Sequence, residues 1–417
     1  MTSFDSLWTS ILDVGQHHST GGYRRFAWGD ADLTLREWFA GEAAARGMDV
    51  EEDRNGNLWA WWLPSGWVGE PTGAFVTGSH LDSVPDGGAF DGPLGVVSAF
   101  AAVDILRDRG VEPTIPVAVT AFSDEEGARF GVACVGSQLT TGALAPERAL
   151  ALRDGDGITL AEAMTKAGRT PTHIGADPAL ADRVGVYVEL HVEQGRALDL
   201  VDRPLAVASS IWPHGRWEFT FDGEANHAGA TRLVDRRDPM LAFASSVHSA
   251  RAAACAHESV ATFGKVHVLP NGANAIPSRI KAWLDARAAD EATLSTLVAA
   301  IEAEARAHCS NDRIELEVLA ESITPIVEFP AEPRERLRRA LRHLGDIPVL
   351  PTAAGHDAGI LSAKVPTAML FVRNPTGVSH SPDEFAERED CIIGARALAD
   401  VMAEWVSAEP ADRNVDG

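Results

Sequence analysis

The chain has 417 residues, of which 45% are hydrophobic and 23% charged, so it can bury large cores and is long enough for two or three domains. Its formal net charge of -24 argues against a nucleic-acid partner, which would need a basic surface. There is no basic-then-apolar leader and no stretch near the ~20 apolar residues of a membrane span, so we expect a cytoplasmic protein without a membrane partner. Four scattered cysteines predict neither a disulfide framework nor a zinc knuckle.

Strand-like apolar runs alternate with helical patterns in the first part of the chain. Residues 35–46 have the periodicity of an amphipathic helix, and residues 94–109 are also expected to form a helix. Residues 56–62, 73–77 and 117–122 read as strands. This alternation predicts an α/β fold with a sheet flanked by helices.

Two candidate metal ligands follow the strand expected at residues 73–77. His80 comes at the end of that strand, and the glycines after it let the backbone fold Asp91 back towards His80. Asp82 could accept a hydrogen bond from the ring N–H of His80 and so fix its tautomer. Taken alone, a His-x-Asp triplet is more often a solvated polar loop, so the later elements must decide.

The strand expected at residues 117–122 is followed by three consecutive carboxylates, Asp124, Glu125 and Glu126. Their mutual repulsion is unfavourable unless cations or strong donors lie among them. Because neighbouring residues at a strand end point to opposite sides, Glu126 could bind a metal while Glu125 stays free for proton transfer to and from water. The alternative is an acidic turn after an edge strand.

A third polar cluster lies on the strand expected from residue 187 onwards. Glu189, His191 and Glu193 fall on one face by period two. A lone histidine there is more often a core residue, but polar neighbours such as Gln194 need partners, and a metal or a substrate would supply them.

From about residue 210 the pattern changes. Strands are expected at 217–221, 261–268, 279–285 and 313–319, with helices at 238–256 and 291–307. This is the β-α-β-β-α-β order of a ferredoxin-like α+β domain. We therefore expect an inserted domain at residues 210–324 within a discontinuous catalytic domain formed by residues 1–209 and 325–417.

After about residue 324 the earlier alternation returns. Helices are expected at 332–344 and 388–405, and a strand at 368–372 precedes His380. Imidazole and carboxylate ligands together suit zinc, manganese, cobalt or nickel better than calcium. The ordered set of candidates predicts a bridged two-metal hydrolase, with the ligands His80, Asp91, Glu126, His191 and His380.

The ordered motifs resemble the amidase, hydantoinase and carbamoylase branch of the dinuclear-metal aminoacylase and carboxypeptidase superfamily. That branch includes N-carbamoyl-L-amino-acid hydrolases, allantoate amidohydrolases and β-ureidopropionases. Each motif is weak alone, but their order is specific, and they span roughly residues 21–406. The motifs are His-Leu-Asp-Ser-Val-Pro at 80–85, Gly-Gly-x-Phe-Asp-Gly at 87–92, Glu-Glu-Gly-x-Arg-Phe at 125–130, Glu-Gln-Gly at 193–195, His-Ala-Gly at 227–229, Asn-Ala-Ile-Pro at 274–277, Leu-Asp-Ala-Arg at 284–287, Gly-His-Asp-Ala at 355–358 and Ser-His-Ser-Pro at 379–382.

The resemblance implies a centre of two divalent metal ions with one shared ligand. Asp91 would bridge both ions, and zinc or manganese would fill the sites first, with cobalt or nickel as alternatives. Glu125 would be the general base. The remaining ligands would be His80 and His191 for one ion, and Glu126 and His380 for the other.

The resemblance also implies substrate contacts and a homodimer. His227 would reach from the lid and dimerisation domain of a partner subunit to polarise the scissile carbonyl. Gln194, Asn274 and Arg287 would contact the substrate and its carboxylate, and His356 would lie near the site.

The implied reaction is hydrolysis of a linear amide or ureido bond in a small carboxylate substrate, with release of ammonia and carbon dioxide. Allantoate and N-carbamoyl-L-amino acids are the leading substrates, and residues 20–28 slightly favour allantoate. The chain departs from the family pattern at residues 230–233 and at Ala353 and Ala354, which could reshape the substrate pocket without touching a ligand.

Three other functions are compatible with parts of the sequence. An N-acyl amino-acid deacylase or dipeptidase would use the same scaffold and metals on ordinary amides. A non-catalytic metal-containing binding protein would not require Glu125. A serine hydrolase is least favoured, because the sequence contains no Gly-x-Ser-x-Gly elbow.

Overall fold

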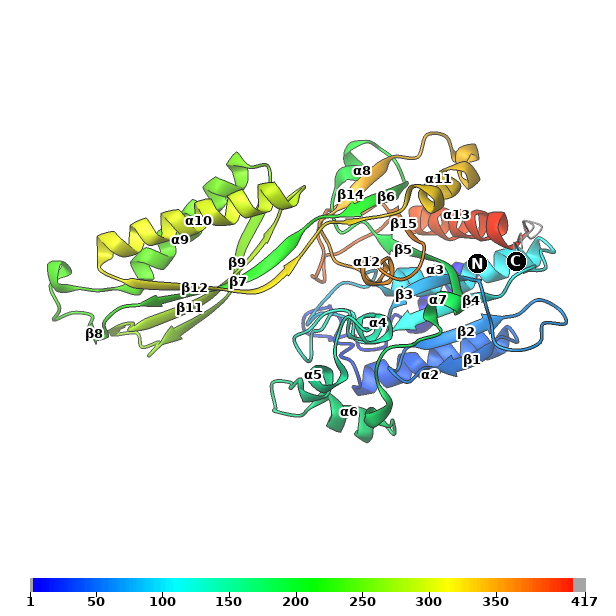
Figure 1. Cartoon of the computed structure of the whole chain (residues 1–417), viewed down its shortest axis with the longest axis horizontal. Helices are drawn as coiled ribbons and strands as arrows, with labels where there is room; N and C mark the ends of the chain where they lie inside the picture. The colour runs from blue at the N-terminus through cyan, green and yellow to red at the C-terminus, as the bar shows by residue number, and fades with distance from the viewer. Residues whose placement is uncertain (1–2, 408–417) are drawn as a thin grey trace, which may run out of the picture. The chain divides into compact units, whose positions relative to one another are not determined.

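The computed structural model describes residues 3–407, and the chain divides into two compact units. Ser210–Glu328 form the smaller unit, and the chain before and after this segment forms the larger one. Figure 1 shows the elements of both units.

The larger unit is built on a mixed sheet with the strand order β1-β2-β4-β3-β5-β15-β6-β13, in which β14 also pairs with β6. Its central strands β4, β3, β5 and β15 are parallel neighbours, and the pairs β1–β2, β2–β4, β15–β6 and β6–β13 are antiparallel. The strands are β1 (Asp49–Glu52), β2 (Leu58–Trp62), β3 (Ala74–His80), β4 (Val117–Phe122), β5 (Val184–Val192), β6 (Leu205–Ile211), β13 (Val327–Glu328), β14 (Val349–Thr352) and β15 (Thr367–Val372).

Helices of very different length surround this sheet (Figure 1). The longest are α2 (Asp30–Ala45), α3 (Pro93–Asp108) and α13 (Arg388–Val406). The shorter ones are α1 (Ser3–Ile11), α4 (Val135–Thr141), α5 (Pro146–Ala151), α6 (Leu160–Lys166), α7 (Leu180–Arg183), α8 (Ala197–Leu200), α11 (Ala331–Ala340) and α12 (Asp357–Leu361), with 3-10 turns at Pro171–His173 and Arg342–Leu344.

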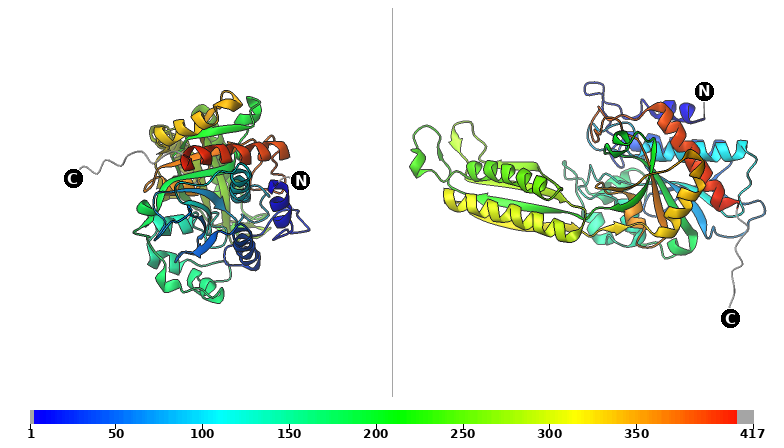
Figure 2. Two further views of the ribbon diagram at one scale, coloured as in Figure 1. Left: turned by 90° about the vertical axis from the view of Figure 1, so that its right-hand side faces the viewer. Right: turned by 90° about the horizontal axis from the view of Figure 1, so that it is seen from above.

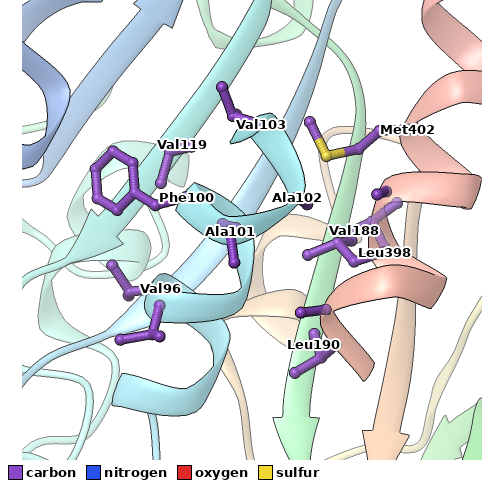
Figure 3. Packing of buried hydrophobic residues seen from close by; sticks show 14 of the residues in the cluster. Val96, Phe100, Ala101, Ala102, Val103, Val119, Val188, Leu190, Leu398 and Met402 are labelled. Carbon is purple, nitrogen blue, oxygen red and sulfur yellow. The ribbon is translucent and has the colours of Figure 1, made fainter. Parts of the chain in front are cut away.

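The main core lies where α3 packs against the central strands and α13. Figure 3 shows Val96 and Phe100 of α3 beside Val119 of β4, and Ala102 facing Val188 of β5 and Leu398 of α13. Helix α3 is apolar almost all round, as expected for a helix covered on several sides. Burying one side chain of the size of Phe100 contributes about 1.5–3 kcal/mol, so this packing fixes the sheet behind the site firmly.

The smaller unit has a four-stranded antiparallel sheet of order β12-β7-β11-β9. Two long helices, α9 and α10, lie side by side on one face of it, as Figure 2 shows. Along β11, Ile280, Ala282, Leu284 and Ala286 are buried in strict alternation and form the core beneath the helices. The elements are β7 (His214–Asp222), β8 (Asn226–His227), α9 (Pro239–Ala256), β9 (Val260–Leu269), β10 (Ala275–Ile276), β11 (Arg279–Arg287), α10 (Glu291–Asp312) and β12 (Glu315–Thr324), with a 3-10 turn at Leu233–Asp235.

Several element boundaries differ from those expected. The strand at residues 117–122 is confirmed as β4, but the strand expected at 73–77 continues to His80. Helix α10 runs five residues further than the expected 307, to Asp312, and ends where Arg313 adopts a φ of 61°. The extension of β3 to residue 80 matters for the site, because His80 is held by the sheet rather than by a loop.

Candidate metal centre

The topology of the large sheet brings the candidate ligands together. Parallel strands end at the same edge of a sheet, and loops at that edge build sites in α/β proteins. His80 is the last residue of β3 and lies opposite Phe122 of β4, so the loop after β4 begins beside it. His191 of β5 lies opposite Phe371 of β15, whose following loop carries His380.

Two groups of candidate ligands share Asp91. His80, Asp91 and His191 form one group and Asp91, Glu126 and His380 the other, each with its donor atoms within 4.8 Å of one another. Oδ1 of Asp91 lies 3.2 Å from Nε2 of His191 and 3.7 Å from Nε2 of His80. Oδ2 lies 3.4 Å from Nε2 of His380. One carboxylate therefore offers a separate oxygen to each group, an arrangement that suits a bridging ligand.

Backbone carbonyls orient the two buried imidazoles. Nδ1 of His191 lies 2.8 Å from the carbonyl oxygen of Val192, and Nδ1 of His80 lies 3.2 Å from that of Asp82. Both Nε2 atoms thus face Asp91. The Asp82 carboxylate is further from the His80 ring, at 3.5 Å, and instead accepts the backbone N–H groups of Glu125 and Glu126 at 3.1 Å each. Asp82 therefore mainly holds the loop of these two glutamates.

A sharp turn, rather than strand alternation, separates Glu125 from Glu126. The expected reason was wrong, because β4 ends at Phe122 and Asp124 adopts a φ of 55°. Oε2 of Glu126 lies 3.6 Å from Nε2 of His380. Glu125 lies beside the other group, with Oε2 3.7 Å from Nε2 of His80.

Burial and neighbouring carboxylates raise the proton affinity of the two glutamates, Glu125 and Glu126. Burial, and then the nearby Asp91, raise the pKa of Glu126 to about 7. Burial also raises the pKa of Glu125 well above its usual range. Burial opposes ionisation of Asp91 too, but its contacts with His191, His380 and His80 hold the pKa of Asp91 well below the usual value. Cations placed between these groups would relieve the repulsion.

Close backbone approach behind His80 requires glycine at position 92. Gly92 has a φ of 86°, and a Cβ atom there would overlap the imidazole of His80. This position begins α3 and follows Asp91 directly, so it lets the chain turn from the shared ligand into the helix.

Glu193, which period two placed on the same face as His191, finds its partners in the backbone. Strand β5 ends at Val192, and the Glu193 carboxylate accepts the backbone N–H groups of Ala197 and Leu198 at 2.5 and 3.0 Å. The Glu193 carboxylate thus binds the free N–H groups in the first turn of α8.

Three of the residues expected to bind substrate or act in catalysis lie in the smaller unit. His227 is exposed in β8, and Ala228 next to it donates its N–H to the carbonyl oxygen of Asn274. Arg287 ends β11, where its guanidinium binds the Asp285 carboxylate at 2.8 and 3.1 Å. His227 and Asn274 are thus neighbours beside the β8–β10 pair. Arg287 is the last residue of β11, and Arg279 is the first.

Comparisons with known proteins identify the family of the chain. The sequence model of peptidase family M20/M25/M40 matches residues 76–404. The chain belongs to this family. It is 37% identical over 95% of its length to an N-carbamoyl-L-amino acid amidohydrolase of Geobacillus stearothermophilus, covering 97% of that protein. It is 31% identical over 91% of its length to an allantoate amidohydrolase of Escherichia coli, covering 92% of it.

A solved structure of a hydrolase is also similar to this chain. The crystal structure of an amidase of the hydantoinase/carbamoylase family from Burkholderia vietnamiensis superimposes with a TM-score of 0.87 and 30% identity, covering 98% of this chain and 97% of that one. These findings confirm the predicted resemblance, the mixed α/β fold and the enzyme class, a hydrolase of linear amide bonds. Within residues 3–407, no helix is both long and apolar enough to cross a membrane.

The donor set fits the metal dependence of the M20 family. Among the described residues, Nε2 of His191 and Oε1 of Glu126 are buried and have no hydrogen-bond partner. Such atoms are costly in a folded protein unless a ligand satisfies them. Imidazole nitrogen and carboxylate oxygen together suit a divalent transition ion or zinc. The residues present therefore fit metal binding.

Gln194 and His356, expected as substrate contacts, lie against the ligand groups themselves. Nε2 of Gln194 donates to Oδ2 of Asp91 at 2.8 Å. His356 is buried with its ring centroid 4.4 Å from that of His191, and it forms a third close group with His191 and Glu189. Oε1 of Gln194 and Nε2 of His356 are both buried without a partner.

Sequence reasoning missed two residues beside the site. Cys134 donates from Sγ to Oε1 of Glu125 at 3.2 Å, and Glu384 contacts the Asp91 loop. Burial, and then Asp91, raise the pKa of Glu384 to about 6. Glu384 lies in an acidic stretch of the kind that is usually exposed, and Cys134 belongs to no paired cysteine motif. Neither residue could therefore be recognised from the sequence as part of the site.

Proposed function

We propose that this chain uses two divalent metal ions to hydrolyse a ureido C–N bond in a small carboxylate substrate. The observation that carries the proposal is Asp91, which offers one oxygen to each ligand group while Glu125 stands beside them unligated. N-carbamoyl-L-amino acids are the preferred substrates and allantoate the second choice. The relative of higher identity, at 37%, supports this order, which reverses the slight preference from residues 20–28.

Each ion has its own set of candidate ligands. His80, Asp91 and His191 would hold one ion, and Asp91, Glu126 and His380 the other. When bound, such a pair polarises a carbonyl oxygen and brings the pKa of water towards about 7. Zinc and manganese suit this donor set, and cobalt and nickel share its preferences.

Glu125 is placed to move the proton of the attacking water. Its Oε1 accepts from Cys134, which leaves Oε2 directed towards the ligand groups. Glu125 takes a proton as the water oxygen bonds to the ureido carbon, and returns it to the departing nitrogen as the C–N bond breaks. With an N-carbamoyl amino acid, the amino acid leaves and the carbamic acid decomposes to ammonia and carbon dioxide.

In this proposal His227 binds the carbonyl oxygen from the lid and dimerisation domain of a partner subunit. Nδ1 of His227 accepts the backbone N–H groups of Gly229 and Ala230 at 3.0 Å each, so a neutral ring carries its proton on Nε2. An Nε2–H donor is what a developing oxyanion needs. Asn274 and Arg287 contact the substrate carboxylate, and Gln194 and His356 complete the pocket from the metal side.

The main test is ammonia release from N-carbamoyl-L-amino acids, allantoate and β-ureidopropionate by metal-loaded and metal-stripped protein. We expect turnover of at least one ureido compound by the loaded protein only, with loss of at least about 10²-fold in E125Q at unchanged metal content. Turnover by fully stripped protein, or full activity of E125Q, would rule the mechanism out.

The same assay separates the alternatives. The family name favours a second candidate, a dipeptidase or N-acyl amino-acid deacylase, so dipeptides and N-acetyl amino acids belong in the panel. Release of an amino acid from these, without ammonia from any ureido compound, would select it. A protein that binds two ions and hydrolyses nothing would be a binding protein.

Mixing two inactive variants tests the role of His227. We expect H227A to lose turnover with its metal content unchanged. If His227 serves the partner's site, mixed dimers of E125Q and H227A regain one complete site, and an equimolar refolded mixture recovers about a quarter of the wild-type activity. If His227 acts within its own chain, no mixture recovers activity, and a fully active H227A would remove His227 from the mechanism.

A further inference from the structure

A buried carboxylate outside both ligand groups touches the loops that carry them. Glu384 is 5% exposed and follows His380 by four residues. Among residues 3–407, no lysine or arginine forms an ion pair with it. Buried carboxylates without a cationic partner are uncommon, because burial penalises their charge. Its position therefore requires an explanation.

Glu384 joins two loops that lie almost three hundred residues apart in sequence. Oε1 accepts the backbone N–H groups of Phe90 and Asp91 at 2.9 and 3.0 Å. Oε2 lies 3.0 Å from Oγ of Ser379, the residue before His380. The same hydroxyl lies 3.2 Å from Oδ2 of Asp91. Because a hydroxyl has one proton, Ser379 shares it between the two carboxylates.

The chain makes room for this contact. A Cβ atom at Gly88 would overlap the Glu384 side chain, so the Asp91 loop can lie this close to Glu384 only with glycine at position 88. The side-chain hydrogen bonds of Glu384 go to the Asp91 loop and to Ser379, and within residues 3–407 none of them reaches His80 or His191.

The arrangement is unfavourable in the absence of cations. Glu384 and Asp91 are both buried carboxylates that approach the same Ser379 hydroxyl, so their negative charges repel each other. A cation among Asp91, Glu126 and His380 would compensate this repulsion. Groups that orient metal ligands from behind commonly change metal affinity 10–100-fold when they are removed.

We propose that Glu384 is a positioning residue for the ion held by Asp91, Glu126 and His380. It keeps the Asp91 loop and the His380 loop at the spacing that this ion requires, and it has little influence on the ion held by His80 and His191. The inference rests on the two-ion part of the proposed function.

The test measures metal affinity directly, by cobalt titration against a competing chelator in the full-length protein without substrate. In E384A we expect the weaker of the two ions to bind about 10–100-fold less tightly and the other to keep its affinity. E384Q retains one oxygen for the two N–H groups, so its loss should be smaller. D383N, which changes the exposed neighbouring carboxylate, is the matched control and should bind both ions as the wild type does.

Two backgrounds identify which ion is affected. H191A removes a ligand of the ion held by His80, Asp91 and His191, and there E384A should still lower the affinity of the remaining ion. H380A removes a ligand of the ion held by Asp91, Glu126 and His380, and there E384A should add little. Equal effects in both backgrounds, or wild-type binding by E384A, would overturn the proposal. If E384A does not fold, E384Q and S379A carry the same comparison.

These readings are independent of turnover. Failure of the wild type to release ammonia from any ureido compound would contradict the proposed substrate but leave the affinity results standing.

Discussion

The two ligand groups around Asp91 are built in different ways. His80 and His191 belong to neighbouring parallel strands and are 1% and 0% exposed. Glu126 and His380 lie in loops, and the side chain of His380 is 52% exposed with a φ of 55°. Ladder hydrogen bonds and the core beneath α3 fix the first group. A few side-chain bonds, from Asp82 and Glu384, hold the second. An ion held by the strand residues His80 and His191, the strand-held ion, should therefore exchange slowly. An ion held by the loop residues Glu126 and His380, the loop-held ion, should exchange readily.

Chelation has the largest expected effect. Stepwise removal of metal should abolish turnover, and most of the activity should disappear while about one ion per chain remains, because the loop-held ion leaves first. Metal content by atomic absorption, followed together with ammonia release, measures this. Simultaneous loss of both ions would remove the distinction between the groups, and added zinc or manganese serves as the control for reversibility.

Alanine substitutions should separate the two groups by stability. In metal-free protein, H191A leaves a cavity in the sheet and should lower the free energy of unfolding by about 2–4 kcal/mol. H380A removes a largely exposed side chain and should cost less than about 1 kcal/mol. Urea denaturation of both variants makes the measurement. Similar losses would indicate that the loop is as tightly packed as the strands.

The pH dependence of stability should reveal the loop-held carboxylate. In metal-free protein burial raises the pKa of Glu126 from 4.5 to about 7, so between these values the folded state binds more protons than the unfolded chain. The free energy of unfolding should fall as pH rises through this window, by up to about 3 kcal/mol. A bound cation keeps Glu126 ionised, so loaded protein should not show this fall.

E126Q provides the matched control for this titration. The variant lacks the ionisable group, so metal-free E126Q should lose less stability than the metal-free wild type between pH 4.5 and pH 7. An identical slope in the two proteins would assign the titration to other buried groups.

The smallest effect is expected at Cys134, which lies beside Glu125. C134A removes the donor to Glu125 and should lower kcat about five-fold with KM unchanged, since one such hydrogen bond contributes about 1 kcal/mol. C134S restores a donor and should recover most of the rate. C391A, which changes a buried cysteine of the core, should affect stability but not kcat.

Local signals were enough for most of the helices and strands, and they selected candidate ligands that the fold brings close together. Continuous apolar runs located β4 and β15, and the β-α-β-β-α-β pattern placed the strands of the smaller unit within a few residues. Boundaries were less accurate where a turn interrupts a regular pattern. Asp124 is the clearest case. Its positive φ marks a sharp turn just after β4, but the run of carboxylates in the sequence does not show where the strand ends and the turn begins.

The neighbours of the ligands were not readable in the same way. Asp383 and Glu384 are adjacent acids in sequence, but one is exposed and the other is buried against Asp91. Glu193 and His191 share a periodicity, but β5 ends between them. In each case the outcome depends on where a strand stops and which loop packs over it.

By itself the sequence determined the family, the chemistry of the donor groups and the order in which they occur along the chain, because residue types and short spacings are local properties. The resemblance already implied a shared Asp91, but only the tertiary structure decided which of its oxygens faces which group, that Asp82 holds the glutamate loop, and that Glu384 joins two distant loops. The physical reason is that the parallel register of β3, β4, β5 and β15 determines which strand ends meet, and the packing of loops at that edge sets the distances between their side chains.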